Sequence, residues 1–375
     1  MKKFAVSLLV MLLASAGVYA EKIDDRLDPI LTGVPSLTIT PDARAGSMGD
    51  AGVATSPDVN SQHWNPAKYA FMESSAGVGL SYTPWLSALV HDIYLAYVAG
   101  YYKINPNQAI SASLRYFSLG DVQITDKDSP VATMTAKPNE FAIDVAYSLL
   151  LSEKFSGAVA LRYIHSDLNV ARDDMSPANA IAADVAFYYK SLIPMAGGDA
   201  PLSFGVDISN IGSKVSYDSG NTSAFLPTNF RLGGAFGYPF DEYNKLSITA
   251  DINKLLVIRR PIGLTETDPE MVDYYNTSGI AGIFKSFGEF KASDIMFSVG
   301  AEYSYQDQFF VRAGYFNESA PAGNRKYYTF GAGFKMNVFA IDAGYVLAAA
   351  QNSPLNNTLR FSLSFNIDGI RELLK

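Results

Sequence analysis

The chain has no cysteine among its 375 residues. This absence excludes a disulfide scaffold, thiolate metal sites and a cysteine nucleophile, and in an exported protein it avoids mispairing in an oxidising compartment. Basic residues are also scarce, because 29 lysines and arginines stand against 37 aspartates and glutamates. No basic stripe is visible that could neutralise phosphates, so nucleic acid is not predicted as a partner.

Catalytic motifs are equally scarce. The three histidines are His63, His91 and His165, and no two of them have metal-ligand spacing. The sequence contains neither a G-x-S-x-G elbow nor a loop that cradles phosphates. His165 and Ser166 are adjacent and could be arranged as a nucleophile pair at a membrane rim, but polar rim residues explain them equally well. We therefore predict no catalytic residue, no cofactor, no metal site and no enzymatic activity.

Long apolar runs are missing after the first twenty residues, so no membrane-spanning helix is predicted there. The first twenty residues have the features of an export signal. Lys2 and Lys3 precede the apolar run 4–13, and residues 18–20 (VYA) offer the small side chains of a cleavage site. An N-terminal anchor is disfavoured because the apolar run is too short. We predict a signal peptide over 1–20, and a mature protein that is either soluble outside the cytoplasm or a membrane β-barrel.

What the chain has instead is alternation. From residue 74 onward, large apolar residues alternate with small or polar ones, as in the run LSFGVDIS that starts at residue 202. A period of two gives a strand one apolar and one polar face. About 14 such stretches, most about ten residues or longer, have the length that a tilted strand needs to cross a bilayer. They are 74–83, 91–103, 107–117, 139–150, 154–166, 179–192, 201–211, 228–239, 244–255, 294–304, 308–317, 326–336, 338–348 and 357–367.

The connections between these stretches alternate between short turns and long loops, which is typical of outer-membrane barrels. The long connections are 118–138, 167–178, 212–227, 256–293, 318–325 and 349–356, with a short helix predicted near 280–287. An even strand number and a short turn after the second strand predict both termini in the periplasm. The predicted fold is all-β, a transmembrane antiparallel β-barrel of about 14 strands over 74–367, followed by a periplasmic tail at 368–375.

The two faces of the strands differ in size. Large residues such as Leu161 and Tyr163 share one face, which we expect to meet lipid, while the small, polar face would line a lumen. Tyrosines near strand ends, including Tyr101 and Tyr188, are expected in interfacial girdles. The predicted lumen charges are Arg115, Asp144, Arg162, Asp184, Asp207, Arg231, Asp251, Glu302, Arg312, Asp342 and Arg360. Mixed signs favour pairing between strands or with an enclosed segment, although solvated wall charges explain any single residue as well.

The segment Pro35–Phe71 has neither a long apolar face nor a helical period, so it has too little apolar surface to fold alone. We predict that it is a hatch inside the barrel, within a lead and hatch region over 21–73. The alternative is a periplasmic extension with no plugging role. The predicted hatch residues are Asp42, Arg44, Met48, Gly49, Asp50, Trp64, Asn65 and Pro66. The charged residues expected to pair with the wall are Asp42, Arg44, Asp50, Asp58 and Lys68.

The run TPDARAGSMGDAGVATSPDVNSQHWNPAKYAF, followed by GLSYTPWL, resembles the PorV/PorQ family of type IX secretion outer-membrane proteins. The detailed likeness covers roughly residues 35–105, and the rest of the chain is similar in barrel length, strand count and loop order. The family is similar in turn to FadL-type barrels, which share an N-terminal hatch and the Asn-Pro-Ala element found here at Asn65–Ala67.

The resemblance implies a non-enzymatic protein of the bacterial outer membrane. It implies that the protein receives cargo bearing the C-terminal type IX signal domain from a SprA-type translocon. Delivery would be to an attachment complex containing the PorU sortase, PorQ and PorZ; outer-membrane lipid is the other expected partner. The loop 256–293 would contact a partner through Tyr274, Tyr275, Ile280 and Phe284. The alternative is a FadL-like transporter of hydrophobic small molecules, with a lateral gap where Gly331 and Gly333 kink a strand.

Overall fold

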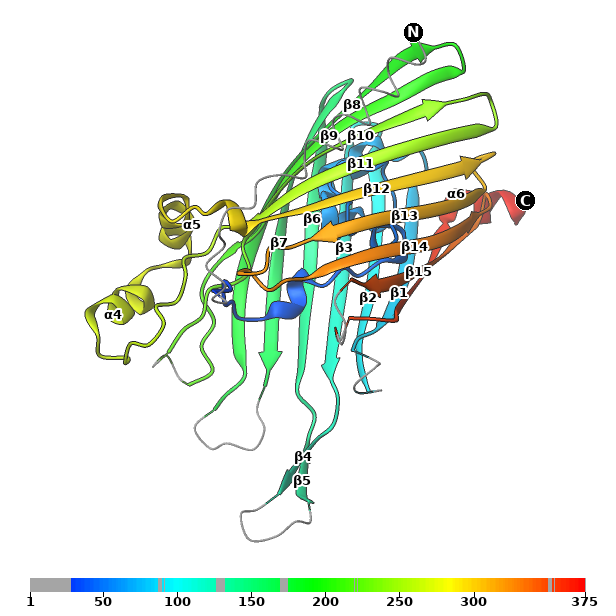
Figure 1. Ribbon diagram of the computed structural model, residues 1–375. Helices are drawn as coiled ribbons and strands as arrows, with labels where there is room; N and C mark the ends of the chain where they lie inside the picture. Colours follow the sequence, from blue (N-terminus) through cyan, green and yellow to red (C-terminus); the bar gives the residue numbers. More distant parts are fainter. Residues whose placement is uncertain are drawn as a thin grey trace.

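The computed structural model describes residues 28–374, apart from 87–89, 91, 126–131, 169–174, 219, 221, 350–352 and 354. The predicted signal peptide and His91 lie outside the described residues. Fourteen antiparallel strands form one closed barrel, as the alternation predicts (Figure 1). They are β1 (Ala76–Pro84), β2 (Ile93–Asn105), β3 (Gln108–Leu119), β6 (Asn139–Ser152), β7 (Phe155–Asp167), β8 (Ala178–Met195), β9 (Gly198–Gly212), β10 (Asn229–Pro239), β11 (Asn244–Leu255), β12 (Ile295–Tyr305), β13 (Phe309–Asn317), β14 (Lys326–Lys335), β15 (Phe339–Ala348) and β16 (Thr358–Asn366).

The barrel closes where β1 pairs with β16, with Gly77 opposite Asn366. The gap predicted in β14 is absent, because Gly331 pairs with Arg312 on one side and Gly344 on the other. Closure leaves no sheet edge in the bilayer, where an unpaired backbone group could not be solvated.

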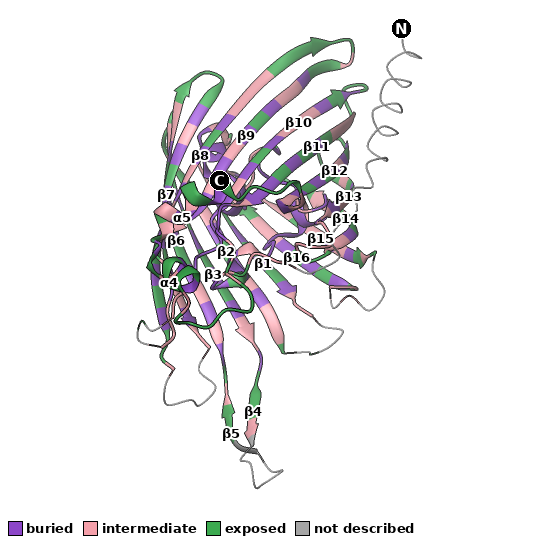
Figure 2. Cartoon of the chain, turned by 60° about the vertical axis from the view of Figure 1, so that its left-hand side comes forward, coloured by how far each residue is buried: buried purple, intermediate pink, exposed green. Residues whose placement is uncertain are grey.

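Exposed and buried residues alternate along the strands (Figure 2). Leu161 is 63% exposed on the outer face of β7, whereas Ala160 beside it is buried. The girdle prediction is wrong for Tyr101 and Tyr188, because both face the interior and are buried. Tyr101 stacks on Tyr69 with ring centroids 5.3 Å apart. Side chains alternate between the two faces of a strand, so a tyrosine at a lumen-facing position points inward even when it lies near the strand end.

The two ends of the barrel differ, as predicted. One end carries short turns, including Gln306–Gln308 between β12 and β13, where Gln306 and Asp307 adopt positive φ angles of 56° and 51°. The long-loop end carries the two-stranded sheet of β4 (Val122–Thr125) and β5 (Ala132–Ala136), α4 (Pro269–Asn276), α5 (Gly279–Gly288) and the 3-10 helix η4 (Ala292–Asp294). The helix predicted near 280–287 is α5, whereas α4 and the β4–β5 hairpin were not predicted.

A short helix, α6 (Ile367–Leu373), follows β16 and begins one residue before the predicted tail 368–375. The Asn366 side chain caps it by accepting a hydrogen bond from the Asp368 amide at 3.0 Å. None of the described helices is long and apolar enough to cross a membrane.

The segment Pro35–Phe71, named here the luminal segment, lies within the barrel. It contains η2 (Pro35–Thr38), α2 (Ala43–Gly46), α3 (Ser61–Trp64) and η3 (Pro66–Phe71). Its residues are mostly buried although its helices are only four to six residues long. Helices this short do not persist in water, so the surrounding wall must hold them in place.

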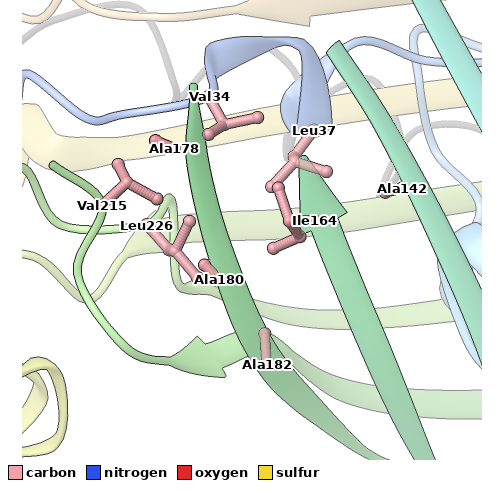
Figure 3. Packing of buried hydrophobic residues seen from close by; sticks show 9 residues of the cluster. All are labelled: Val34, Leu37, Ala142, Ile164, Ala178, Ala180, Ala182, Val215 and Leu226. Atoms are coloured by element: carbon pink, nitrogen blue, oxygen red, sulfur yellow. The ribbon is translucent and has the colours of Figure 1, made fainter. Parts of the chain in front are cut away.

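The lead enters at the long-loop end, where Asp28, the first described residue, lies, whereas the end of the chain for which a periplasmic position is predicted lies outside the described residues. The Asp28 amide donates to the Pro321 carbonyl at 2.9 Å in the β13–β14 loop. Val34 packs with Val215 and Leu226 from the β9–β10 loop (Figure 3). The segment then crosses the lumen towards the short-turn end, where β1 begins.

Candidate functional site

The luminal segment is folded around a contact between Asp42 and Trp64. One oxygen of the Asp42 carboxylate caps α2 by accepting from the Ala45 amide at 2.9 Å. The other oxygen accepts from the Trp64 indole at 2.7 Å, which joins α2 to α3. Burial, followed by the charge of Asp58, raises the pKa of Asp42 to about 6. Trp64 thus anchors the segment as predicted, but Asp42 bonds within the segment and not to the wall.

The Asn65–Pro66 pair forms the turn that the sequence predicts. Asn65 follows α3 and caps η3, since its side-chain oxygen accepts from the Ala67 amide at 3.0 Å. Its side-chain amide donates to the Val53 carbonyl at 3.1 Å and to the Phe187 carbonyl of β8 at 2.9 Å. One asparagine therefore ends a helix, starts another and ties both to the wall.

Lys68 is buried, and no carboxylate among the described residues lies at hydrogen-bond distance from its ammonium. Its ammonium donates to the Gly52 carbonyl at 2.9 Å and to the Thr55 hydroxyl at 3.1 Å. Burial lowers the pKa of Lys68 to about 8. The predicted wall pairing of Lys68 is wrong: it cross-links the loop between α2 and α3 to η3.

Arg44 connects the segment to β12. It donates two hydrogen bonds to the Glu302 carboxylate, both at 3.1 Å, and one to Asp58 at 2.8 Å. Glu302 also accepts from Arg312 at 2.6 Å, and Arg312 in turn donates to Asp342 at 2.6 Å. The predicted lumen charges of β12, β13 and β15 thus join the segment in one ion-pair network.

Asp50 of the segment accepts hydrogen bonds from the wall, and Asp251 of the wall accepts hydrogen bonds from the segment. Arg360 of β16 donates to Asp50 at 2.6 Å, and the Tyr327 hydroxyl of β14 donates to its other oxygen at 2.5 Å. Asp251 of β11 accepts from the backbone amides of Gly52 at 2.6 Å and Val53 at 2.9 Å. A wall carboxylate therefore replaces the hydrogen-bond partner that a turn of the segment lacks.

Arg115 and Arg231 of the wall bind η2 and α3 of the segment. Arg115 of β3 donates to the Ser36 and Ile39 carbonyls at 2.6 and 2.9 Å, and to the Nδ1 atom of His63 at 2.8 Å. Burial, followed by the charge of Arg115, lowers the pKa of His63 well below its usual value, so His63 is a neutral acceptor. Arg231 of β10 donates to the His63 carbonyl at 2.7 Å and lies over the Trp64 ring.

Other lumen charges pair between strands. Arg162 of β7 bridges Asp144 of β6 at 2.5 Å and Asp184 of β8 at 2.8 Å. Arg231 pairs with Asp207 of β9 at 3.4 Å. Both kinds of pairing predicted from the mixed signs therefore occur, and each of these ion pairs lies inside the wall (all residues under a tenth exposed).

Glycines of the barrel wall leave space for the backbone of the luminal segment. Gly49 adopts a φ of +69°, and its amide donates to the Thr329 hydroxyl of β14 at 2.8 Å. A Cβ on Gly314 of β13 would lie 2.1 Å from the Gly49 nitrogen and 2.2 Å from the Met48 carbonyl carbon. A Cβ on Gly300 of β12 would lie 2.4 Å from the Met48 Cβ. The small residues of the lumen face are thus the places where segment and wall backbones touch.

A cavity of about 270 Å³ lies beside the segment near the long-loop end. Its wall includes His63 and Trp64 from α3 and Asn229, Arg231 and Asn253 from β10 and β11. The Nε2 atom of His63 and the side-chain oxygen of Asn229 are buried without a hydrogen-bond partner among the described residues. The two unpartnered polar atoms suit water, and the apolar side chains of Leu255, Met296 and Phe316 also line the cavity.

The four residues of the 256–293 loop that were predicted to contact a partner differ in how far they are exposed. Tyr274 is buried: its ring lies 5.3 Å from that of Phe225, and its carbonyl accepts from the Lys214 ammonium at 3.0 Å. Burial lowers the pKa of Lys214, which also lies over the Phe225 ring, to about 8. The sequence analysis did not predict this contact between two loops, because sequence alone does not bring residues 214 and 274 together. Tyr275 is half-buried, whereas Ile280 and Phe284 are exposed.

The possible nucleophile pair at the rim is excluded by strand geometry. His165 faces outward, with its Nδ1 atom 2.8 Å from the side-chain oxygen of Asn179. Ser166 faces inward, is fully buried and donates to Glu140 at 3.1 Å. Adjacent residues of a strand point to opposite faces, so they cannot act as a pair. Among the described residues, no group of three or more metal-ligating side chains is positioned to hold an ion.

The fold resembles that of a solved hydrocarbon transporter. The Pseudomonas putida toluene transporter TodX matches with a TM-score of 0.50 and 11% identity, over 90% of this chain and 99% of that one. The Ralstonia pickettii toluene transporter TbuX gives a TM-score of 0.47 and 12% identity over 86% and 96%. At 11% identity, the match to TodX shows the fold alone. No curated protein sequence matches the chain.

A family model gives the stronger assignment. The model described as type IX secretion system protein PorV matches residues 21–262. That range includes the whole luminal segment and the barrel strands from β1 to β11. The match agrees with the closed barrel of fourteen strands. The chain therefore belongs to the PorV family of type IX secretion system proteins.

Proposed function

We propose that this protein receives cargo bearing a C-terminal type IX signal domain and shuttles it to the cell surface. The cargo comes from a SprA-type translocon and goes to the attachment complex of the PorU sortase, PorQ and PorZ. The observation that carries the proposal is the PorV family match over residues 21–262. Its domains are then a signal peptide (1–20), a lead and hatch (21–73), an outer-membrane barrel (74–367) and a periplasmic tail (368–375).

The occupied lumen supports a carrier role over a conduit role. Arg115 on β3, Glu302 on β12 and Arg360 on β16 each bond to the luminal segment, so the segment bridges distant parts of the wall. A folded protein cannot pass a lumen that is crossed in this way. Cargo recognition therefore takes place at the long-loop end, which faces the cell exterior in this orientation.

The loops of that end form the proposed receptor. The β4–β5 hairpin projects beyond the barrel rim (Figure 1). The loops 213–228 and 256–294 are held together by Lys214, which donates to the carbonyls of Tyr274 and Tyr275. Loops fixed by such contacts present a surface with less conformational entropy to lose on binding.

Deletion of residues 256–293 tests this assignment. The barrel should remain heat-stable in detergent, because its strands pair without the loop, while capture of a purified signal domain in a pull-down should be lost. A truncation before Ile370 is the matched control, since it shortens α6 at the opposite end and should leave capture intact. Normal capture by the loop deletion would refute the receptor assignment.

The transporter of hydrophobic small molecules is the second candidate, and its support is the shared fold with TodX. The cavity beside the segment has a mixed lining, in which His63, Asn229 and Arg231 stand beside Leu255, Met296 and Phe316. Hydrocarbon that co-purifies with the barrel and is released when the segment is mutated would favour transport. Co-purification with a translocon subunit and with signal-bearing cargo would favour the carrier role.

A further inference from the structure

The helix α5 has an apolar face that the rest of the described chain leaves uncovered. Ile280, Phe284 and Phe287 follow one another at helical spacing and are 60%, 71% and 59% exposed (Figure 2). Phe290, just beyond the helix, is 52% exposed. The opposite side of α5 is buried, because a Cβ on Gly282 would lie 2.5 Å from the Phe225 ring. The apolar face therefore points away from the protein.

The position of α5 is fixed at the end of β9. A Cβ on Gly279, the first residue of α5, would lie 2.0 Å from the Gly212 carbonyl oxygen. Gly212 pairs with Ala182 of β8, next to Ile181, which is 68% exposed on the outer wall. The helices α4 and α5 lie beside the barrel and not over its opening (Figure 1). The face of α5 thus continues the outer surface of the wall.

Cross-strand register connects this position with a row of aromatic residues on the outer wall, called here the aromatic belt. The rings of Tyr82 and Tyr94 are 5.6 Å apart, and those of Tyr94 and Tyr116 are 6.2 Å apart. The belt continues through Phe141 to Tyr163, which pairs across the strands with Ile181. Tyrosine and tryptophan rings gather where a bilayer meets water. On β8 and β9 the belt gives way to Ile181 and Ile211. The first residue of α5, Gly279, packs against Gly212, the next residue of β9.

We propose that α5 is an interfacial helix that lies in the outer boundary of the membrane and completes the aromatic belt. Its apolar face contacts the acyl chains at the level of the headgroups. Ile280 and Phe284 therefore contact lipid, and cargo contact falls to the rest of the 256–293 loop. Lys285 lies between the exposed phenylalanines and pairs with Asp273 at 2.9 Å, which keeps its charge on the water side. An amphipathic helix with phenylalanines on one face binds a bilayer surface in this way.

Cysteine labelling tests the proposal directly, because the chain has no native cysteine. Phe284→Cys is labelled with an environment-sensitive fluorophore and reconstituted into phosphatidylcholine vesicles containing nitroxide-labelled lipid. Leu161→Cys, on the lipid face of β7, is the positive control. Met134→Cys, on the β4–β5 hairpin away from the wall, is the negative control. The label at 284 should be blue-shifted and quenched at least half as strongly as the label at 161.

Quenching at 284 no greater than at 134 would overturn the proposal. A label at 284 that lipid does not quench but a purified signal domain shields would also overturn it, and would assign the face to cargo. Because quenching is measured without cargo, failure of the lipid contact can be told apart from failure of the carrier role. A second label at Phe287→Cys guards against local damage by one substitution, and both positions must be quenched.

Discussion

Arg44 of the luminal segment and Glu302 of β12 are joined by two hydrogen bonds of 3.1 Å, although 258 residues separate them in the sequence. Paired bonds of this kind between a guanidinium and a carboxylate are strong and fix orientation as well as distance. The same carboxylate binds Arg312, so the segment shares a charge network with the wall. Substitutions at this contact can therefore test whether the luminal segment seals the barrel.

Loss of Arg44 and Trp64 should open the lumen. The double substitution Arg44→Ala with Trp64→Ala removes the bonds to Glu302 and Asp42 and should destabilise the segment by about 3–5 kcal/mol. Small-solute permeability and single-channel conductance should rise, while heat-modifiable migration of the barrel stays normal. Arg325→Ala, which removes a rim arginine paired with Glu318, is the control and should not leak. Unchanged conductance in the double variant would mean that the segment is not the seal.

A side chain at Gly314 should displace the segment without opening the sheet. Gly314→Val places a branched side chain where the Gly49 nitrogen and the Met48 carbonyl carbon now lie. Faster hydrogen exchange is expected at residues 43–52, with the strand amides still protected. Gly234→Ala is the matched control, because its Cβ would meet only the Phe204 ring at 3.3 Å and a carbonyl at 3.8 Å. Equal exchange in the two variants would contradict the contact.

Protonation of Asp42 should stabilise the segment in mild acid. The pKa of Asp42 is raised from 3.8 to about 6 in the folded segment. The folded state thus holds the Asp42 proton more tightly, so this group contributes on the order of 1–3 kcal/mol of stability as pH falls from about 7 to about 4. His63 contributes with the opposite sign below about 6.5, because its pKa is lowered in the folded segment. Guanidinium titrations that follow Trp64 fluorescence in a Trp85→Phe background measure this. Asp42→Asn should remove the Asp42 contribution, so the variant should lose more stability in acid than the parent protein; equal pH profiles for the two would contradict the assignment.

The lead should be reachable from outside the cell. Leu31 is 55% exposed and belongs to the lead that contacts the β9–β10 and β13–β14 loops. With no native cysteine to compete, Leu31→Cys should react with a membrane-impermeant maleimide added to intact cells. Glu153→Cys in the short β6–β7 turn should react only after the outer membrane is permeabilised. The reverse pattern would show that the barrel lies the other way round.

Particular residues show how far the sequence could predict the site. Arg44 and Asp50 were expected to reach wall charges and do so, at Glu302 and Arg360. Asp42 is negative like Asp50, and Lys68 is positive like Arg44, but both bond within the segment. Sequence supplies the charges and their signs, whereas the choice of partner depends on which atoms the fold brings within 3 Å or so of each other.

The sequence by itself determined the strands, their inward and outward faces and the alternation of short turns with long loops. These features depend on a period of two and on local turn residues, which neighbouring residues specify. Only the tertiary structure decided that the lead enters at the long-loop end and that α5 continues the outer wall. The reason is that ring closure joins strands far apart in sequence, as at Gly77 and Asn366, and no local pattern records which residues then meet.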